Sequence, residues 1–198
     1  LVAGRDETIT ESATPIEYDW AGESARITGV LVHRHLCRLA NLPADRWGTY
    51  LQRSRPHYAA QLAQAGIAAD EVANAANRVG ETLEQTVGDP RGRWILIGGS
   101  QARSEYALTW GQNGQVRNVI IDRTFVDDQG TRWIIDYKTG YHGGGDLEGF
   151  LDREQERYSG QLQEYAQVIR QLGDEPIRLG LYFPRMAAWR EWVAEYEN

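Results

Sequence analysis

Three apolar runs in the second half of the chain, separated by two short turn-forming segments, most constrain the fold. The runs cover residues 105–110, 115–126 and 131–137, and the segments between them are Gly-Gln-Asn-Gly at 111–114 and Asp-Asp-Gln-Gly at 127–130. Runs rich in β-branched and aromatic residues, bounded by glycine, asparagine and aspartate, are typical of strands joined by tight turns. The pattern therefore predicts a three-stranded meander.

Helical patterns precede this meander. Residues 24–40 place Val32, Leu36 and Leu39 at three- and four-residue spacing, which predicts an amphipathic helix. Residues 44–88 are rich in alanine, glutamine and glutamate and predict two or three helices, the last from about 69 to 87. We expect the segment 41–88 to be a helical insertion or cap that lies away from the reaction centre.

A helix and two more strands are predicted after the meander. A glycine-rich loop at 140–149 leads to a helix over about 151–172, and strands follow at 177–183 and 187–193. Helices, a meander, a helix and strands in this order indicate an α/β or α+β fold, with a central mixed β-sheet flanked by helices on both faces.

Length and composition limit the functional classes. The chain has 198 residues, a net charge of −7 and one cysteine, Cys37, so it has no internal disulfide and no four-cysteine zinc or iron–sulfur site. No run of eighteen apolar residues is present, and we expect a cytoplasmic protein. The acidic charge argues against a free-standing, tightly DNA-binding module. We therefore expect another domain or chain to supply most of the contacts that bind nucleic acid.

The polar, acidic residues 1–23 show no periodicity, and we expect them to form a leading segment or linker. Residues 24–198 are long enough for one domain with a substantial core. Because the sequence starts with Leu1 rather than methionine, we expect it to be one part of a longer polypeptide.

Two carboxylates, those of Asp122 and Asp136, lie in the hairpin that we expect the second and third strands to form. If the 127–130 turn closes symmetrically about Gln129, Asp122 lies opposite Asp136, and the two-residue period places Lys138 on the face of Asp136. Directly opposed Cβ atoms are about 4.5–5.5 Å apart, so two like charges there need a cation between them. A one-residue slip, or a bulge at Gly130, would move one acid to the other face.

An acid, a spacer and a lysine at the end of a strand are common by chance, so further motifs are needed to assign a function. Five motifs occur in order: a helix segment at 29–36 with His33, an acid at Glu105, the pair Asp122-Arg123, the segment Ile-Ile-Asp-Tyr-Lys-Thr-Gly at 134–140, and a late helix with Tyr158, Gln161, Leu162 and Tyr165. Together they resemble the PD-(D/E)XK nuclease superfamily, in its RecB/AddA-type branch. The resemblance covers residues 27 to about 185, with 41–88 outside it, and implies a restriction-endonuclease-like core.

The resemblance implies a divalent-metal site for Mg²⁺ or Mn²⁺. The implied ligands are His33, Asp122, Asp136 and the backbone carbonyl of Tyr137. Glu105 would be an additional ligand or an acceptor that supports the site. A second histidine, His35, points about 200° away from His33 on a helix, and we treat it as structural.

The resemblance also implies catalytic and supporting roles. Lys138 would position and help deprotonate the attacking water, or stabilise charge on the phosphate, beside the catalytic carboxylates. Tyr158, Gln161 and Tyr165 lie on one stripe of the late helix, where they either pack on the sheet or reach site atoms and a DNA backbone. Arg123 and Arg185 are candidate phosphate contacts, although isolated arginines are more often solvated.

The sequence therefore predicts a metal-dependent deoxyribonuclease, specifically an exonuclease, that forms the nuclease module of a helicase–nuclease in DNA-end processing, recombination and repair. Its expected partners are DNA and helicase domains in the same polypeptide or in a partner chain. One alternative is an inactive nuclease-fold scaffold or DNA-end-binding module. The other is an interaction domain whose motifs arise by chance.

Overall fold

The computed structural model describes residues 16–112 and 115–195, so the first fifteen residues of the expected leading segment 1–23 and two residues of the first turn lie outside this description. The first helix, α1 (Ile16–Ala40), begins eight residues before the predicted start at Ser24. Residues 16–23 of the expected leading segment 1–23 are therefore helical and continuous with the predicted helix. Pro15, directly before the helix, is the sequence signal for this earlier start, because proline is common at helix starts.

Three helices follow within the segment 41–88, as predicted. They are α2 (Trp47–Ser54), α3 (Tyr58–Gln64) and α4 (Val72–Gly88), with short 3₁₀ turns at Ala44–Arg46 and Arg55–His57. Another helix, α5 (Pro90–Ile97), was not predicted. Asp89 caps it by accepting a hydrogen bond from the Gly92 N–H, and Pro90 occupies the first turn, where its missing N–H has no cost.

The sheet has five strands in the order β1-β2-β3-β4-β5. The strands are β1 (Ser100–Gln112), β2 (Gln115–Val126), β3 (Arg132–Tyr137), β4 (Ile177–Phe183) and β5 (Ala188–Val193). Only β3 and β4 are parallel, and the helix α6 (Leu147–Arg170) forms the crossover between them. The mixed sheet, the strands at 115–126 and 177–183 and the edge strand near 188–193 are confirmed.

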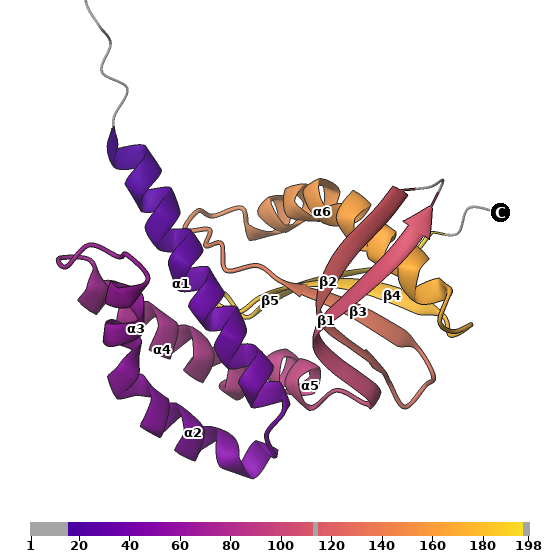
Figure 1. The fold of residues 1–198 in the computed structure, drawn as a ribbon, viewed down its shortest axis with the longest axis horizontal. Coiled ribbons are helices and arrows are strands. Elements are labelled where there is room, and N and C mark those ends of the chain that lie inside the picture. The colour runs from indigo at the N-terminus through magenta and orange to yellow at the C-terminus, as the bar shows by residue number, and fades with distance from the viewer. Residues whose placement is uncertain (1–15, 113–114, 196–198) are drawn as a thin grey trace, which may run out of the picture.

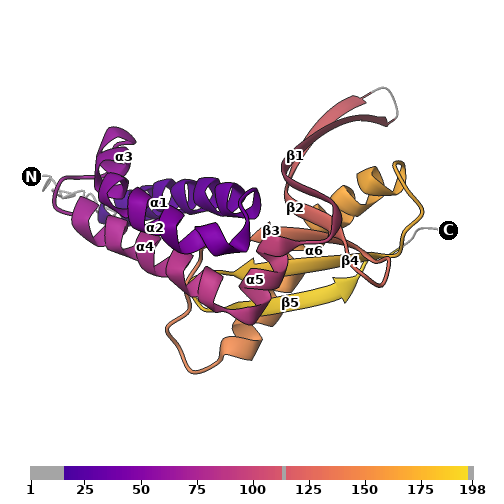
Figure 2. The ribbon, with the colours of Figure 1, turned by 90° about the horizontal axis from the view of Figure 1, so that it is seen from below.

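Helices cover both faces of the sheet, as predicted (Figures 1 and 2). On one face, buried side chains of α1–α5 pack with Phe125, Ile135 and Tyr182. On the other face, α6 packs with Ile134 and Leu181. The helices of segment 41–88 thus contribute to the same core as the sheet, and their status as an insertion stays a prediction. The division into a leading segment and one domain also stays a prediction.

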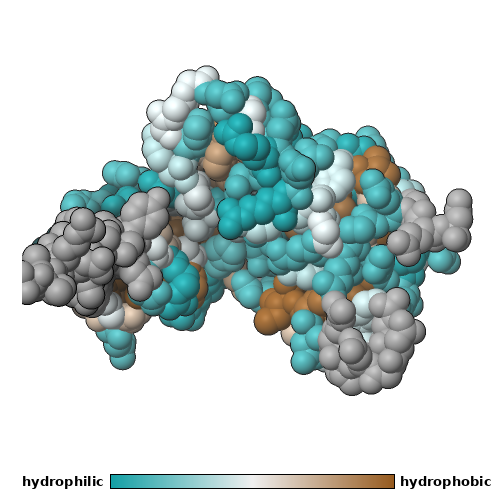
Figure 3. Space-filling view, turned by 90° about the horizontal axis from the view of Figure 1, so that it is seen from above, coloured by the Kyte–Doolittle hydropathy of each residue, from teal (hydrophilic) through white to brown (hydrophobic). Residues whose placement is uncertain are grey.

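Large exposed apolar side chains are scattered over the described surface. They are Val30, Ile97, Ile120, Tyr141, Leu147, Leu172 and Val193. The face in Figure 3 is largely hydrophilic, with small separate hydrophobic areas. No helix in the described part of the chain is long and apolar enough to cross a membrane.

His35 of α1 is a buried histidine that faces the helices rather than the sheet. Its ring is 5% exposed, its Nδ1 lies 2.6 Å from the Tyr50 hydroxyl, and it packs edge-on against Tyr58. Burial, with Arg38 and Arg34 adding repulsion, lowers the pKa of His35 from 6.5 to about 4. His35 is therefore neutral in the folded protein at pH 7.

We expect this burial to make stability depend on pH. The unfolded chain takes up a proton at His35 near pH 6.5, whereas the folded chain does so near pH 4. The contribution of His35 is therefore fully present above about pH 6.5 and is lost as the pH falls toward 4. Thermal melts between pH 7.5 and 4.5 should show a smaller loss for His35→Gln than for wild type. The exposed His57→Gln control should keep the wild-type slope, and equal slopes for all three proteins would contradict this account.

Candidate functional site

The site forms where β2 and β3 stop pairing. The register pairs Arg123 with Ile135 and Val126 with Arg132, which confirms the predicted symmetry about Gln129. The backbone pairing ends at Arg123 and Ile135. Beyond this pair, the Tyr137 N–H donates a hydrogen bond to a side chain instead, Asp122 Oδ2, at 2.8 Å. Asp122 and Asp136 thus stand across from each other at the end of the hairpin.

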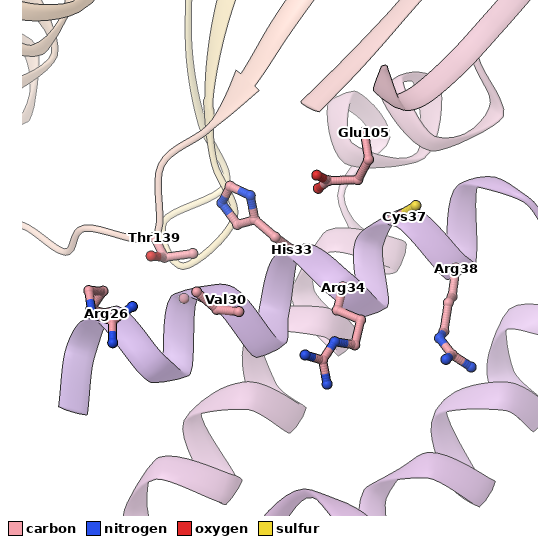
Figure 4. Close-up of a pocket in the computed structure, with 9 residues that line it drawn as sticks. Arg26, Val30, His33, Arg34, Cys37, Arg38, Glu105 and Thr139 are labelled. Carbon is pink, nitrogen blue, oxygen red and sulfur yellow. The ribbon is translucent and has the colours of Figure 1, made fainter. Parts of the chain in front are cut away.

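Three side chains from three elements form a group that could ligate a metal: His33 of α1, Glu105 of β1 and Asp122 of β2. Each offers one ligand atom, and these atoms all lie within 4.8 Å of one another. His33 Nδ1 is 3.5 Å from Asp122 Oδ2. In Figure 4 the His33 ring and the Glu105 carboxylate approach the same space above α1. We refer to His33, Glu105 and Asp122 as the trio.

Glu105 reaches the trio through an unusual backbone conformation. It lies between the pairs Ser104↔Arg123 and Tyr106↔Ile121, which places it across from Asp122. Its φ of 49° is in the left-handed region, where a non-glycine residue costs about 1–3 kcal/mol. The surrounding strand pairs on both sides must hold this conformation.

Asp136 and Lys138 form an ion pair beside the trio. Lys138 Nζ lies 2.7 Å from Asp136 Oδ2 and 3.5 Å from the centre of the Tyr158 ring of α6. Both side chains are largely buried, with 17% and 8% of Lys138 and Asp136 exposed. The structure therefore brings together five sequence-predicted site residues from α1, β1, β2, β3 and the residue that follows β3.

Residues 19–192 match the family model of the PD-(D/E)XK nuclease superfamily. The chain belongs to this superfamily. Its five-stranded mixed sheet with flanking helices is the restriction-endonuclease-like fold of these nucleases. No protein of curated function matches the sequence. Among solved structures, the chain resembles that of SSO0001 at 16% identity, over 87% of this chain and 80% of that chain, with a TM-score of 0.35.

The electrostatics of the PD-(D/E)XK site favour a bound cation. Burial and the charge of Asp122, against the opposing effect of Lys138, raise the pKa of Asp136 to about 6. Burial and Asp122 also raise the pKa of Glu105. Burial alone would lower the pKa of His33, but Asp122, Asp136 and Glu105 together raise it. Three carboxylates thus face one lysine and one imidazole. A bound divalent cation would reduce the repulsion among the carboxylates.

The predicted stripe on α6 faces this site. Tyr158 lies against Lys138, and Gln161 Nε2 donates a hydrogen bond to the Tyr165 hydroxyl at 2.5 Å. Tyr165 is 8% exposed, and burial raises its pKa, with Gln161 opposing and the charge of Asp136 adding to the effect. The stripe therefore packs on the sheet and supports Lys138.

Arg123 is not available as a phosphate contact. It is 2% exposed and donates hydrogen bonds to the carbonyls of Ile95 and Leu96, at 3.0 and 2.9 Å, and to Ser104 Oγ at 3.0 Å. The proposed DNA contact at Arg123 is wrong, because this guanidinium satisfies the carbonyl end of α5. The other expected role of Arg123, supporting the site, agrees with these contacts. Arg123 connects α5 to Ser104, the residue before Glu105.

Sequence analysis missed the close contact that places His33. A Cβ on Gly29 of α1 would lie 2.7 Å from Thr139 Oγ1, which follows β3. Glycine at this position leaves room for the Thr139 hydroxyl against α1. The glycine at the start of the 29–36 motif was the available signal, but only the fold shows that Thr139 is its partner.

We expect Gly29→Ala to reduce nuclease activity by about tenfold, because the new methyl group pushes α1, and His33 with it, away from Asp122. Cleavage rates measured at saturating metal should show the loss. Thr139→Ala removes the clashing oxygen, so Gly29→Ala should cost much less activity in that background. Equal losses in both backgrounds would show that the contact does not position His33.

Proposed function

We propose that this chain is a divalent-metal-dependent deoxyribonuclease of the RecB/AddA type that acts as an exonuclease. It serves as the nuclease module of a cytoplasmic helicase–nuclease in DNA-end processing, recombination and repair. Its partners are DNA and helicase domains in the same polypeptide or in a partner chain. The observation that carries the proposal is the trio standing beside the Asp136–Lys138 ion pair.

The donor set fits a hard divalent cation. Two carboxylates and an imidazole within 4.8 Å of one another offer the oxygen and nitrogen ligands that Mg²⁺ and Mn²⁺ accept. Asp122, Glu105 and His33 would hold the ion, and Asp136 and the carbonyl of Tyr137 are further candidates on the same side. When bound, such an ion polarises a phosphodiester and lowers the pKa of water.

The residues around the donors supply orientation and charge. The Tyr137 N–H fixes one oxygen of Asp122, and the Tyr137 ring packs edge-on against His33 at 5.7 Å between centroids. Asp136 and the face of Tyr158 hold the Lys138 ammonium near the carboxylates. From this position Lys138 stabilises negative charge that develops on the phosphate and orients the attacking water.

The five ordered motifs support the RecB/AddA-type assignment, and the net charge of −7 supports the need for a helicase partner that grips DNA. The alternative of an inactive scaffold is less favoured, because a scaffold has no need for a buried Lys138–Asp136 pair next to a strained Glu105. Burying charges costs several kcal/mol per ion, which a binding function alone does not repay.

A cleavage assay tests the proposal. The protein is incubated with end-labelled linear DNA and with closed circular DNA in Mg²⁺, in Mn²⁺ and in EDTA. We expect metal-dependent degradation of the linear DNA only, and no cleavage in EDTA. Cleavage of circular DNA would replace the exonuclease proposal with an endonuclease. Metal-independent binding without cleavage in either metal would favour the scaffold.

A further inference from the structure

Two cavities flank the Gly29–Thr139 contact. The first has a volume of about 640 Å³ and is lined by His33 and Glu105 of the trio. The second has a volume of about 1190 Å³ and extends toward α4 and α6. Both include Arg26, Gly29 and Thr139 in their walls, so one connected surface leads from the trio into the second cavity.

The second cavity concentrates arginines from four separate parts of the fold. They are Arg26 of α1, Arg78 of α4, Arg157 of α6 and Arg185, which follows β4. Arg26 pairs with Glu23 and Arg157 with Glu154, at 2.5 and 3.6 Å. Within the described residues, Arg78 and Arg185 form no ion pair. Glu71, which accepts a hydrogen bond from Ser24, is the acidic member of the wall.

Arg78 and Arg185 line the same cavity, and their charges repel each other. Burial lowers the pKa of Arg185, and the charge of Arg78 lowers it further, whereas Tyr141 and Glu81 act in the opposite direction. A bound anion in this cavity would offset the mutual repulsion of Arg78 and Arg185. Arginine offers five N–H donors in a planar fork that matches a phosphate.

Aromatic rings accompany these arginines. Tyr141 is 60% exposed, and the Arg185 guanidinium lies 4.8 Å from its ring centre. Tyr158 also lines the cavity, between Arg157 and Lys138. Single-stranded nucleic acids are bound by such surfaces, where cations follow the backbone and rings stack on unpaired bases. A duplex hides its base faces and cannot use the rings.

We propose that the cavity lined by Arg78, Arg185 and Tyr141 binds the backbone of a single DNA strand whose neighbouring nucleotides cross Gly29 and Thr139 to the trio. This rests on the proposed nuclease function and deepens it, since it names single-stranded DNA as the substrate at the reaction site. It also gives the helical segment 41–88 a role, because Arg78 belongs to α4. Further along α1, the side chains of Arg34 and Arg38 line the first cavity (Figure 4) and extend the basic surface past His33.

Fluorescence anisotropy tests this proposal with labelled oligo(dT) strands and a duplex of equal length, in EDTA so that nothing is cut. We expect Arg78→Gln and Arg185→Gln each to raise the Kd for oligo(dT) by about tenfold at low salt. Each should also reduce the salt slope of log K by about 0.7, the value for one lost phosphate contact on a single strand. Tyr141→Ala should weaken binding without changing the salt slope.

The control is Arg53→Gln on α2, an exposed arginine outside both cavities, which makes the same charge change. It should bind as wild type does, and Arg78→Lys should retain most of the affinity. Thermal melts establish that each variant is folded. Equal weakening by Arg53→Gln, or equal affinity of all variants for the duplex and the single strand, would overturn the proposal.

The binding and cleavage readouts separate this proposal from the nuclease function. Arg78→Gln should raise the KM for cleavage of a single strand and leave kcat near the wild-type value, because Arg78 lies outside the trio. If wild type cuts DNA but Arg78→Gln and Arg185→Gln bind and cut normally, the strand-binding proposal fails and the nuclease stands. If the arginine variants lose binding but wild type never cuts, the nuclease function fails and the strand-binding cavity stands.

Discussion

Asp122→Asn should abolish metal-dependent cleavage while leaving the fold intact. Asp122 joins the trio to the rest of the site, because its carboxylate faces His33 and accepts the Tyr137 N–H. The asparagine oxygen can still accept that N–H, so the end of the β2–β3 hairpin is kept. The lost charge should weaken Mg²⁺ binding by roughly 10²-fold and reduce the cleavage rate at least as much.

The same substitution should have opposite effects on stability with and without metal. Without metal, Asp122→Asn removes repulsion that raises the pKa values of Asp136 and Glu105, so the variant should be as stable as wild type or more stable. With Mg²⁺ at 100 times its Kd, wild type gains about 2.7 kcal/mol and the variant gains little. Thermal melts with and without Mg²⁺ measure both effects.

Asp128→Asn is the matched control, because Asp128 is an exposed acid in the neighbouring turn and the charge change is identical. This control should keep wild-type cleavage and the full stabilisation by Mg²⁺. Wild-type cleavage by Asp122→Asn would remove Asp122 from the metal site.

The hairpin geometry was predictable from sequence because it depends on local turn chemistry. The turn fixes the register about Gln129, and the two-residue period then opposes Asp122 and Asp136 without reference to the rest of the fold. Asp127 reinforces this turn by accepting hydrogen bonds from the N–H groups of Gln129 and Thr131, each at 2.9 Å. A strong local signal of this kind does not need tertiary information.

The position of His33 next to Asp122 and the burial of Arg123 were not predictable from local patterns. The resemblance placed His33 at the site, but the position of α1 depends on the close contact between Gly29 and Thr139, which are far apart in sequence. Arg123 looked like a phosphate contact because arginines are usually exposed. Its burial follows from the unpaired carbonyls at the end of α5, a helix that the sequence analysis did not predict.

The resemblance implied a place for Glu105 at the site, but its position across from Asp122 depends on how β1 pairs with β2. The pairs Ser104↔Arg123 and Tyr106↔Ile121 keep one register on both sides of Glu105, although its φ is 49°. The sequence of residues 105–110 alone does not reveal this register. Asp136 contacts Lys138 beside the trio, and its expected role as a metal ligand stays a prediction.

Lys138→Met should reduce kcat by about 10²–10³-fold, the loss expected when a positioned charge is removed from a phosphoryl-transfer site. Methionine keeps the length of the apolar stem and its packing on Tyr158 but lacks the ammonium. Because the trio is unchanged, Mg²⁺ should still stabilise the variant, and KM should change much less than kcat. Single-turnover cleavage with pre-bound DNA and Mg²⁺ titrations by thermal melting separate these quantities.

The same variant should unfold more easily as the pH rises. Without Lys138, the buried carboxyl of Asp136 loses its contacting cation, so its pKa rises above the wild-type value of about 6. A folded-state pKa above the unfolded value means that stability is retained at low pH and lost as the pH rises through the folded pKa. Relative to wild type, Lys138→Met should therefore be most destabilised above pH 6, by up to about 3 kcal/mol.

A second substitution separates the structural role of Lys138 from its chemical role. In Lys138→Met/Asp136→Asn both members of the buried pair are neutral, so stability near pH 7.5 should return toward the wild-type value. Cleavage should stay at least as low as in Lys138→Met, because neither the ammonium nor the Asp136 carboxylate is present. If the double variant recovered cleavage together with stability, Lys138 would act only by balancing the charge of Asp136, and the proposed role at the phosphate would be wrong.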